Sequence, residues 1–167
     1  MIRLKTILVA TDLSPLSECA VRHGCELAKQ FAADLHLLTV ASYPFSDFAQ
    51  ECQKDHGRSI DECEAEHFAA AEAQLSEIDV APLHQSWVTR VTQKGFPIAE
   101  ILRYAQANKA DLLILGTHGL TGLQHIFMGS VAEMIVRTAP CPVLTVRDIQ
   151  HHFVPLEAAG LRMETGG

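Results

Sequence analysis

The chain has 167 residues, of which 48% are hydrophobic, and a formal net charge of −7 at pH 7. This length and apolar content suffice for one domain with a continuous core, which we assign to residues 1–147, followed by a tail at residues 148–167. No apolar run approaches the roughly 20 residues of a membrane-spanning helix, and the negative charge disfavours contact with a nucleic-acid backbone. We therefore expect a cytoplasmic protein whose partners include neither nucleic acid nor a membrane.

The first quarter of the chain predicts a strand, a helix and a second strand. TILVA, at residues 6–10, is a continuous β-rich run of the kind buried on both faces of a parallel sheet. Ser14 and Pro15 then form an N-cap and first-turn signal, and apolar residues follow at helical spacing. LHLLTV, at residues 35–40, is again strand-like.

The middle of the chain predicts a helical segment and a third strand. Residues 45–77 have a helical rhythm that Gly57 interrupts. Ser59 to Glu62 has the spacing of a capping box, which restarts the helix. WVTRV, at residues 87–91, alternates as a strand does, and KGFP at residues 94–97 turns the chain into a third helix.

The last part of the domain continues the alternation. DLLIL at residues 111–115 predicts a fourth strand, residues 131–139 a fourth helix and CPVLTV at residues 141–146 a fifth strand. Strict alternation of short apolar strands with helices indicates parallel βαβ units and an open α/β sheet with helices on both faces. Five strands are too few for a closed eight-stranded barrel.

The stretch GTHGLTGLQHIFMGS, residues 116–130, carries four glycines in fifteen positions between the fourth strand and the fourth helix. At the carboxyl end of a parallel strand, glycines let a ligand approach the backbone, and a helix N-terminus offers N–H groups to an anion. A plain long turn is the alternative, because Ser130 and Glu133 have the spacing of a capping box that satisfies the helix end unaided. The residues alone leave both interpretations open.

Several motifs in this order resemble the nucleotide-binding branch of the universal stress protein family. They are KTILVATDLS, KADLLILGTHG, the spacing G-x2-G-x9-G-S, and GSVAEMIVRTAPCPVLTVR. The resemblance extends from about residue 5 to residue 147. It implies a Rossmann-like sheet of order 3-2-1-4-5, of the adenine nucleotide alpha hydrolase type, with ATP or AMP at the carboxyl ends of strands 1 and 4. It also implies a stress-response regulator.

The resemblance assigns roles to individual residues. Asp12 would hold the ribose hydroxyls or a phosphate-bound Mg2+, and Val40 would read the adenine edge through its backbone. The complete set of nucleotide-binding candidates is Ala10, Thr11, Asp12, Val40, Gly116, Thr117, His118, Gly119, Gly129, Ser130 and Val131. The family commonly forms homodimers through the last strand, which here comprises Pro142, Val143, Leu144, Thr145 and Val146.

Two of these positions depart from the family pattern. Thr117 and His118 stand where many relatives have a Ser-Arg pair, so the permanent positive charge beside the phosphates is absent. His118 is mostly neutral near pH 7 unless a ligand raises its pKa. We therefore expect nucleotide affinity to be weaker and more dependent on pH than in those relatives.

A metal site was considered among the cysteines and histidines. The five cysteines are an odd number without CxxC spacing, so we expect thiols instead of a disulfide framework. Cys52 with His56, and Cys63 with His67, repeat a pair at i, i+4 spacing that could bind zinc. On one continuous helix the two pairs would lie ~16 Å apart, so they could share an ion only if the helix bent at Gly57. We expect no zinc.

Three functions remain open at this point. Binding of ATP as a signal is preferred, because the sequence offers an acid and a glycine loop but no evident catalytic base or arginine finger. Slow ATP hydrolysis is the enzyme alternative. The third is a nucleotide-free dimeric module that contacts an unknown client protein.

Overall fold

The computed structural model describes residues 2–42, 59–117 and 129–147, which fold into a five-stranded parallel sheet of order β3-β2-β1-β4-β5. The strands are β1 (Thr6–Ala10), β2 (Asp34–Ala41), β3 (Val88–Lys94), β4 (Leu112–Gly116) and β5 (Val143–Val146). The longer helices are α1 (Glu18–Phe31), α3 (Ile60–Glu77), α4 (Pro97–Ala107) and α5 (Ser130–Thr138). The predicted open α/β fold and its strand order are confirmed.

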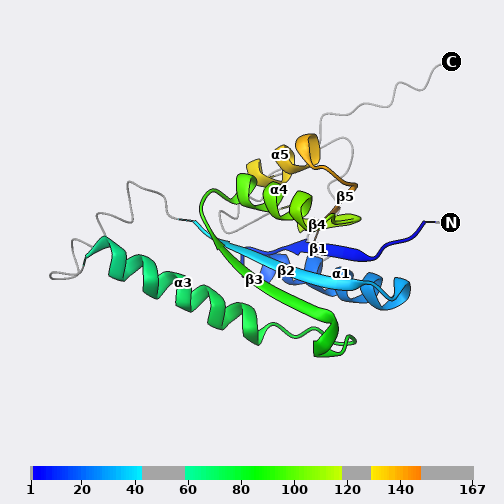
Figure 1. Cartoon of the computed structure of the whole chain (residues 1–167), viewed down its shortest axis with the longest axis horizontal. Coiled ribbons are helices and arrows are strands. Elements are labelled where there is room, and N and C mark those ends of the chain that lie inside the picture. Colours follow the sequence, from blue (N-terminus) through cyan, green and yellow to red (C-terminus); the bar gives the residue numbers. More distant parts are fainter. Residues whose placement is uncertain (1, 43–58, 118–128, 148–167) are drawn as a thin grey trace, which may run out of the picture.

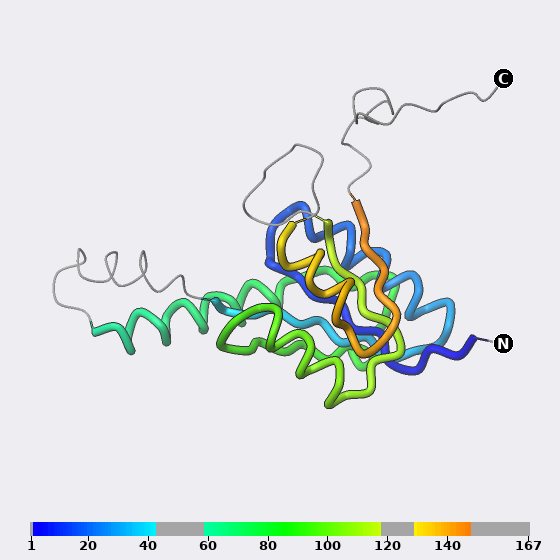
Figure 2. Tube along the Cα trace, turned by 90° about the horizontal axis from the view of Figure 1, so that it is seen from above, coloured from blue at the N-terminus to red at the C-terminus, as the bar shows by residue number. Residues whose placement is uncertain are grey.

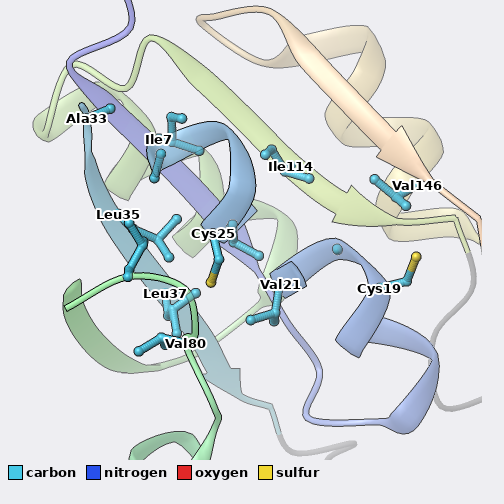
Figure 3. Packing of buried hydrophobic residues seen from close by; sticks show 14 of the residues in the cluster. Ile7, Cys19, Val21, Cys25, Ala33, Leu35, Leu37, Val80, Ile114 and Val146 are labelled. Atoms are coloured by element: carbon cyan, nitrogen blue, oxygen red, sulfur yellow. The ribbon is translucent and has the colours of Figure 1, made fainter. Parts of the chain in front are cut away.

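Helices cover both faces of the sheet. Figure 1 shows α4 and α5 above the sheet and α3 below it. The face under α1 has a core built around Ile7, Leu35 and Ile114, with Val80 from the segment after α3 (Figure 3). The opposite face has a second core under α4 and α5, where Leu8 and Leu113 are completely buried. Burial on both faces explains why these strands are continuously apolar.

Some element boundaries differ from the sequence prediction. Residues Pro15–Ser17 form a short 3-10 helix, so α1 begins at Glu18 instead of directly after Ser14. Strand β3 extends to Lys94, past its predicted end. The capping box that starts α3 is confirmed, because the Ser59 hydroxyl accepts from the Glu62 N–H at 3.2 Å and the Ser59 N–H donates to the Glu62 carboxylate at 2.9 Å.

Arg90, on β3, stabilises the C-terminal end of α3. Its guanidinium donates to the Leu75 carbonyl at 3.1 Å, to the Ile78 carbonyl at 2.9 Å and to the Gln85 side chain at 2.7 Å. A cation at this end of a helix satisfies carbonyls that lack intrahelical partners and complements the helix dipole. The alternating pattern of the strand did not reveal this role, because the contact depends on where α3 ends.

The described cysteines are free thiols, and two of them belong to the core. Cys19 and Cys25 are buried, and Figure 3 shows both on α1, within the layer between that helix and the sheet. Burial, together with the nearby carboxylate of Asp79, raises the pKa of Cys25 to about 11. Cys25 is therefore an uncharged packing residue at neutral pH. Cys52 lies outside the described residues.

β5 lies at one edge of the sheet, and the predicted homodimer through Pro142 to Val146 stays a prediction. The tail at residues 148–167 lies outside the described residues, so the predicted domain division also stays a prediction. Among the described helices, none combines the length and the apolar character needed to cross a membrane.

Gly24 allows α1 to approach the sheet closely. A Cβ at this position would overlap Val9 Cγ2 and lie 3.3 Å from Leu35 Cδ1. Val9 and Leu35 are completely buried on neighbouring strands, so neither side chain can move aside freely. A glycine inside a helix normally costs about 1 kcal/mol relative to alanine, and here close packing compensates for that cost.

We expect Gly24→Ala to lower the free energy of unfolding by about 1 kcal/mol, because overpacking of ~1–3 kcal/mol exceeds the gain in helix propensity. In a Val9→Ala background the overlap disappears, and the same substitution should become stabilising. Urea unfolding of the four proteins in this double-mutant cycle measures the coupling. An equal effect of Gly24→Ala in both backgrounds would contradict the close approach.

Asp111 joins the starts of β1 and β4. One carboxylate oxygen accepts from the Lys5 N–H at 2.7 Å and from the Thr6 N–H at 3.0 Å, while the Asp111 N–H donates to the Thr6 carbonyl at 2.9 Å. The hydrogen bonds from Lys5 and Thr6 lower the pKa of Asp111 below its ordinary value. The sequence pattern had placed Asp111 inside the fourth strand, but β4 begins at Leu112. The Asp111 side chain instead accepts hydrogen bonds from the backbone of residues 5 and 6.

A carboxyl whose folded-state pKa is lowered adds stability above its unfolded pKa of about 3.9 and loses it as pH falls through the folded value. We expect Asp111→Asn to lower the free energy of unfolding by about 1 kcal/mol at pH 7. The difference in the free energy of unfolding between Asp111→Asn and the wild type should shrink as the pH is lowered from 5 to 2, as measured by urea unfolding. Glu72→Gln, an exposed change on α3, is the control. A difference that is constant with pH would contradict the role of the carboxylate.

Candidate functional site

The register of three neighbouring strands brings the predicted site residues to one edge of the sheet. Ala10, the last residue of β1, lies opposite Leu38 of β2 and Leu115 of β4. The ladder continues for one residue, because the Thr11 N–H donates to the Leu38 carbonyl at 2.9 Å. Two residues further along each parallel strand, Asp12, Val40 and Thr117 come level with one another. This edge is where open α/β sheets bind ligands.

A chain of hydroxyl groups sets the corner between β1 and α1. The Ser17 hydroxyl donates to the Ser14 carbonyl at 2.7 Å, so it must accept its 2.7 Å hydrogen bond from Thr11. The Thr11 oxygen in turn accepts from the Leu13 N–H at 3.0 Å. Thr11, Ser14 and Ser17 are all buried, so each hydroxyl has a defined partner and the corner is rigid.

Asp12 begins this corner. Its Oδ1 accepts from the Ser14 N–H at 3.1 Å and from the Ser14 hydroxyl at 2.6 Å, which is the Asx-turn geometry of a residue that shapes a loop. Leu13, which follows, has a φ of 63°. A non-glycine residue in the left-handed region costs of order 1–3 kcal/mol, and the surrounding hydrogen bonds hold it there. Asp12 therefore has a structural role at the edge where the predicted site lies.

The ends of the glycine-rich loop meet at the same edge. The Gly129 N–H donates to the Thr117 carbonyl at 2.8 Å, and the Thr117 N–H donates to the Val146 carbonyl at 2.9 Å. The loop between them, which includes the predicted residues His118 and Gly119, lies outside the described residues. These two hydrogen bonds place the start of α5 directly beside the end of β4.

The capping box at Ser130, on which the alternative interpretation of this stretch rested, is not formed. Gly129 is the N-cap of α5, and as a glycine it has no side chain that could cap the helix. Ser130 is the first residue of the helix and is exposed. The Glu133 carboxylate instead accepts from Arg137 at 3.0 Å, and the Glu133 N–H makes the first intrahelical bond, to the Gly129 carbonyl at 2.9 Å. The helix starts one residue earlier than expected because Gly129 is held by Thr117.

Gly129 is not required by the conformation of the backbone. Its φ of −58° and ψ of 147° are open to any residue. A Cβ built there would lie 3.4 Å from the Thr117 carbonyl oxygen, which is an ordinary van der Waals contact. Neither its dihedral angles nor its packing against residues 2–42, 59–117 and 129–147 requires a glycine here, and such a glycine is expected where a ligand approaches the backbone closely.

All of the described candidates lie at the carboxyl edge of the sheet or at the adjoining helix start, and two of them also pack against a core. Val131 is half-buried and packs against the core under α4 and α5, as does Val40. The fold brings these candidates to the carboxyl edge of β1, β2 and β4 or to the start of α5: Ala10, Thr11, Asp12, Val40, Gly116, Thr117, Gly129, Ser130 and Val131.

A cavity of about 510 Å³ lies next to this edge, on the face of the sheet that carries α1 and α3. Thr11 is the only one of the described candidates in its lining. Glu18, Glu77 and Asp79 outnumber the single cation Arg22 around it. Because three carboxylates repel phosphates, the cavity does not suit the phosphate groups of a nucleotide.

Within residues 2–42, 59–117 and 129–147, no three side chains of His, Cys, Asp or Glu come together in a way that could hold a metal ion. Cys63 and His67 lie on α3, whereas Cys52 and His56 lie outside the described residues. A magnesium ion usually binds to one or two carboxylates together with the phosphates of a substrate, and Asp12 is the carboxylate at this edge.

The fold and the edge define an open-sheet α/β protein whose loop after β4 leads into a helix N-terminus. Comparison with known proteins gives the family. The model of the universal stress protein family matches residues 3–147. The universal stress protein MJ0531 of Methanocaldococcus jannaschii is 34% identical over 146 residues, which are 86% of this chain and 82% of the relative. The chain belongs to the universal stress protein family.

Solved structures agree with this assignment. A hypothetical protein named MJ0577, whose structure was used to assign its biochemical function, has a TM-score of 0.72 and 26% identity, covering 89% of this chain and 99% of that one. A universal stress protein solved in complex with cAMP has a TM-score of 0.55 and 22% identity, covering 87% of this chain and 98% of that one. The second likeness concerns the fold alone.

We expect Thr11→Val to lower the free energy of unfolding by about 2 kcal/mol, because it leaves the Leu13 N–H and the Ser17 oxygen without their hydrogen-bond partner. Thr11→Ser keeps the hydroxyl and should cost less than about 1 kcal/mol, for the lost methyl group. Urea unfolding at neutral pH compares the two variants. If Thr11→Ser were the more destabilised, the methyl group and not the hydroxyl chain would hold the corner.

Proposed function

We propose that this protein binds an adenine nucleotide, ATP with Mg2+, at the carboxyl edge of β1, β2 and β4. We further propose that occupancy of the site by the nucleotide regulates a client protein in a stress response. The observation that carries the proposal is Gly129, at the N-cap of α5 beside the end of β4, a glycine that neither its dihedral angles nor its packing against the described residues requires.

The phosphates would bind at the start of α5. The N–H groups of Ser130, Val131 and Ala132 precede the first intrahelical hydrogen bond, so they point out of the helix end together with its partial positive charge of about half a unit. Backbone donors of this kind hold anions without a basic surface. This explains how a chain with a net charge of −7 can bind a polyanion.

The ribose and the base would bind along the same edge, towards β2. Asp12 follows β1, the strand between β2 and β4, so its carboxylate would lie between the phosphates and the end of β2. A carboxylate accepts hydrogen bonds from ribose hydroxyls and can also coordinate a phosphate-bound Mg2+. The Val40 backbone, at the end of β2, would contact the edge of the base.

Adenine nucleotides are the first ligands to test for two reasons. The motifs in the sequence resemble the nucleotide-binding branch of the family, and a universal stress protein of the same fold has been solved in complex with cAMP.

We expect calorimetry with ATP and Mg2+ to detect binding by the wild type and at least a tenfold weaker affinity for Gly129→Val, whose side chain would occupy the position of a phosphate oxygen. Met134→Ala, an exposed change on the same helix, should bind as the wild type does. Thermal unfolding of each protein without nucleotide controls for stability.

The same samples test the alternatives. If the wild type and Met134→Ala release inorganic phosphate from ATP and Gly129→Val does not, the protein is an ATPase. If the wild type neither binds nucleotide nor releases one on denaturation, the proposal is overturned and the protein-interaction module becomes the preferred function.

A further inference from the structure

We propose that Phe96 is the residue on which the adenine base stacks, and that it therefore contributes to selection for a purine at this site. This inference rests on the function proposed above. No motif used to recognise the family includes Phe96, and the sequence analysis treated it as part of a turn.

The backbone around Phe96 is restricted on both sides. Gly95 has a φ of 137°, and a Cβ there would lie 2.9 Å from the Glu100 carboxylate, which folds back over it. Pro97 follows, and a residue before proline is confined to the extended region, where Phe96 indeed lies with φ −83° and ψ 122°. Gly95, Phe96 and Pro97 thus form a rigid corner between β3 and α4.

The Phe96 ring is presented to solvent at this corner. Its exposed fraction is 72%, the largest of any described aromatic residue. It belongs to neither hydrophobic core, whereas Ile98, two residues further on, packs under α4. An aromatic side chain on a rigid backbone loses little conformational entropy when it binds a flat ligand.

The corner lies beside the end of β2. Lys94 is paired with Ala41 in the sheet, and the Gly95 N–H donates to the Ala41 carbonyl at 3.3 Å. In the sheet Val40, the residue proposed to contact the base, pairs with Gln93, so Phe96 lies three residues beyond the position level with Val40, where the chain leaves β3 beside the end of β2. A phenyl ring placed there can reach a base that lies over the end of β2.

The phosphate site and Phe96 lie on the same side of the sheet. Phe96 is the N-cap of α4 and Gly129 is the N-cap of α5, and these helices cover one face together in Figure 1. Seen from above in Figure 2, the start of α4 and the start of α5 both lie toward the carboxyl ends of the strands. A nucleotide with its phosphates at α5 and its base at β2 would therefore reach α4 with the base.

Stacking on an aromatic ring contributes about 1–3 kcal/mol per base in nucleic-acid complexes, which corresponds to a change in affinity of roughly 5- to 150-fold. The contribution depends on the flat face of the base and not on the phosphates. Loss of the ring should therefore weaken ATP binding without affecting a ligand that has phosphates alone.

The first experiment measures affinities by calorimetry for ATP with Mg2+ and for tripolyphosphate with Mg2+. Phe96→Ala should weaken ATP binding by about tenfold and leave tripolyphosphate unchanged. Phe96→Tyr keeps the ring and should bind ATP as the wild type does. Phe31→Ala, which removes another partly exposed phenylalanine, is the matched control and should change neither affinity.

The second experiment reports on stacking directly. Trp87 is the only tryptophan of the chain, so the double variant Trp87→Phe and Phe96→Trp has a single fluorophore at the proposed site. ATP should quench its emission with the affinity found by calorimetry, and tripolyphosphate should not.

The results separate this inference from the function on which it rests. If the wild type binds ATP and Phe96→Ala binds it equally well, the role of Phe96 is overturned while the nucleotide site stands. If Phe96→Ala weakens ATP and tripolyphosphate alike, the ring supports the fold and does not stack. If the wild type binds no ATP, both proposals fail.

Discussion

The main-chain hydrogen bonds that hold β1 between β2 and β4 are the constraint on which the rest of this structure depends. They fix the register in which Ala10 lies opposite Leu38 and Leu115, and parallel strands in register end at a common edge. A shift of one residue would exchange the two faces of β1 and remove Leu8 and Val9 from their cores. The same register brings Asp12, Val40 and Thr117 level, so the apolar packing of the strands also positions the polar edge.

The candidate site is therefore formed mainly by backbone groups, and its supports are internal. The hydroxyl chain from Thr11 through Ser17 to Ser14 holds the corner after β1, and the hydrogen bond from Gly129 to Thr117 holds the start of α5. Fixed N–H donors need no reorganisation when an anion arrives. The acidic side chains of α3 and of the neighbouring cavity lie on the other face of the sheet from α5. The negative net charge of the protein therefore does not prevent an anion from binding at the start of α5.

The residues around the candidate site were predicted from the sequence with unequal success. Asp12 and Val40 were assigned from the family resemblance, and the fold brings both to one edge, because Asp12 comes two residues after β1 and Val40 lies near the end of β2. Ser130 was misjudged, because its spacing to Glu133 matched a capping box while a hydrogen bond from Gly129 to Thr117, across the loop, moved the start of the helix. Phe96 was overlooked, because exposure on a rigid corner is not visible in a sequence pattern.

The sequence by itself determined the alternation of strands and helices, the parallel sheet, the capping box at Ser59 and the glycine-rich entry to α5, because each follows from local periodicity and the chemistry of neighbouring residues. Tertiary structure decided which residues meet across the chain. Arg90 caps α3, Asp111 binds the N–H groups of Lys5 and Thr6, and Gly24 makes room for Val9. These contacts join residues between 12 and 106 positions apart, and their partners become neighbours only when the sheet has formed.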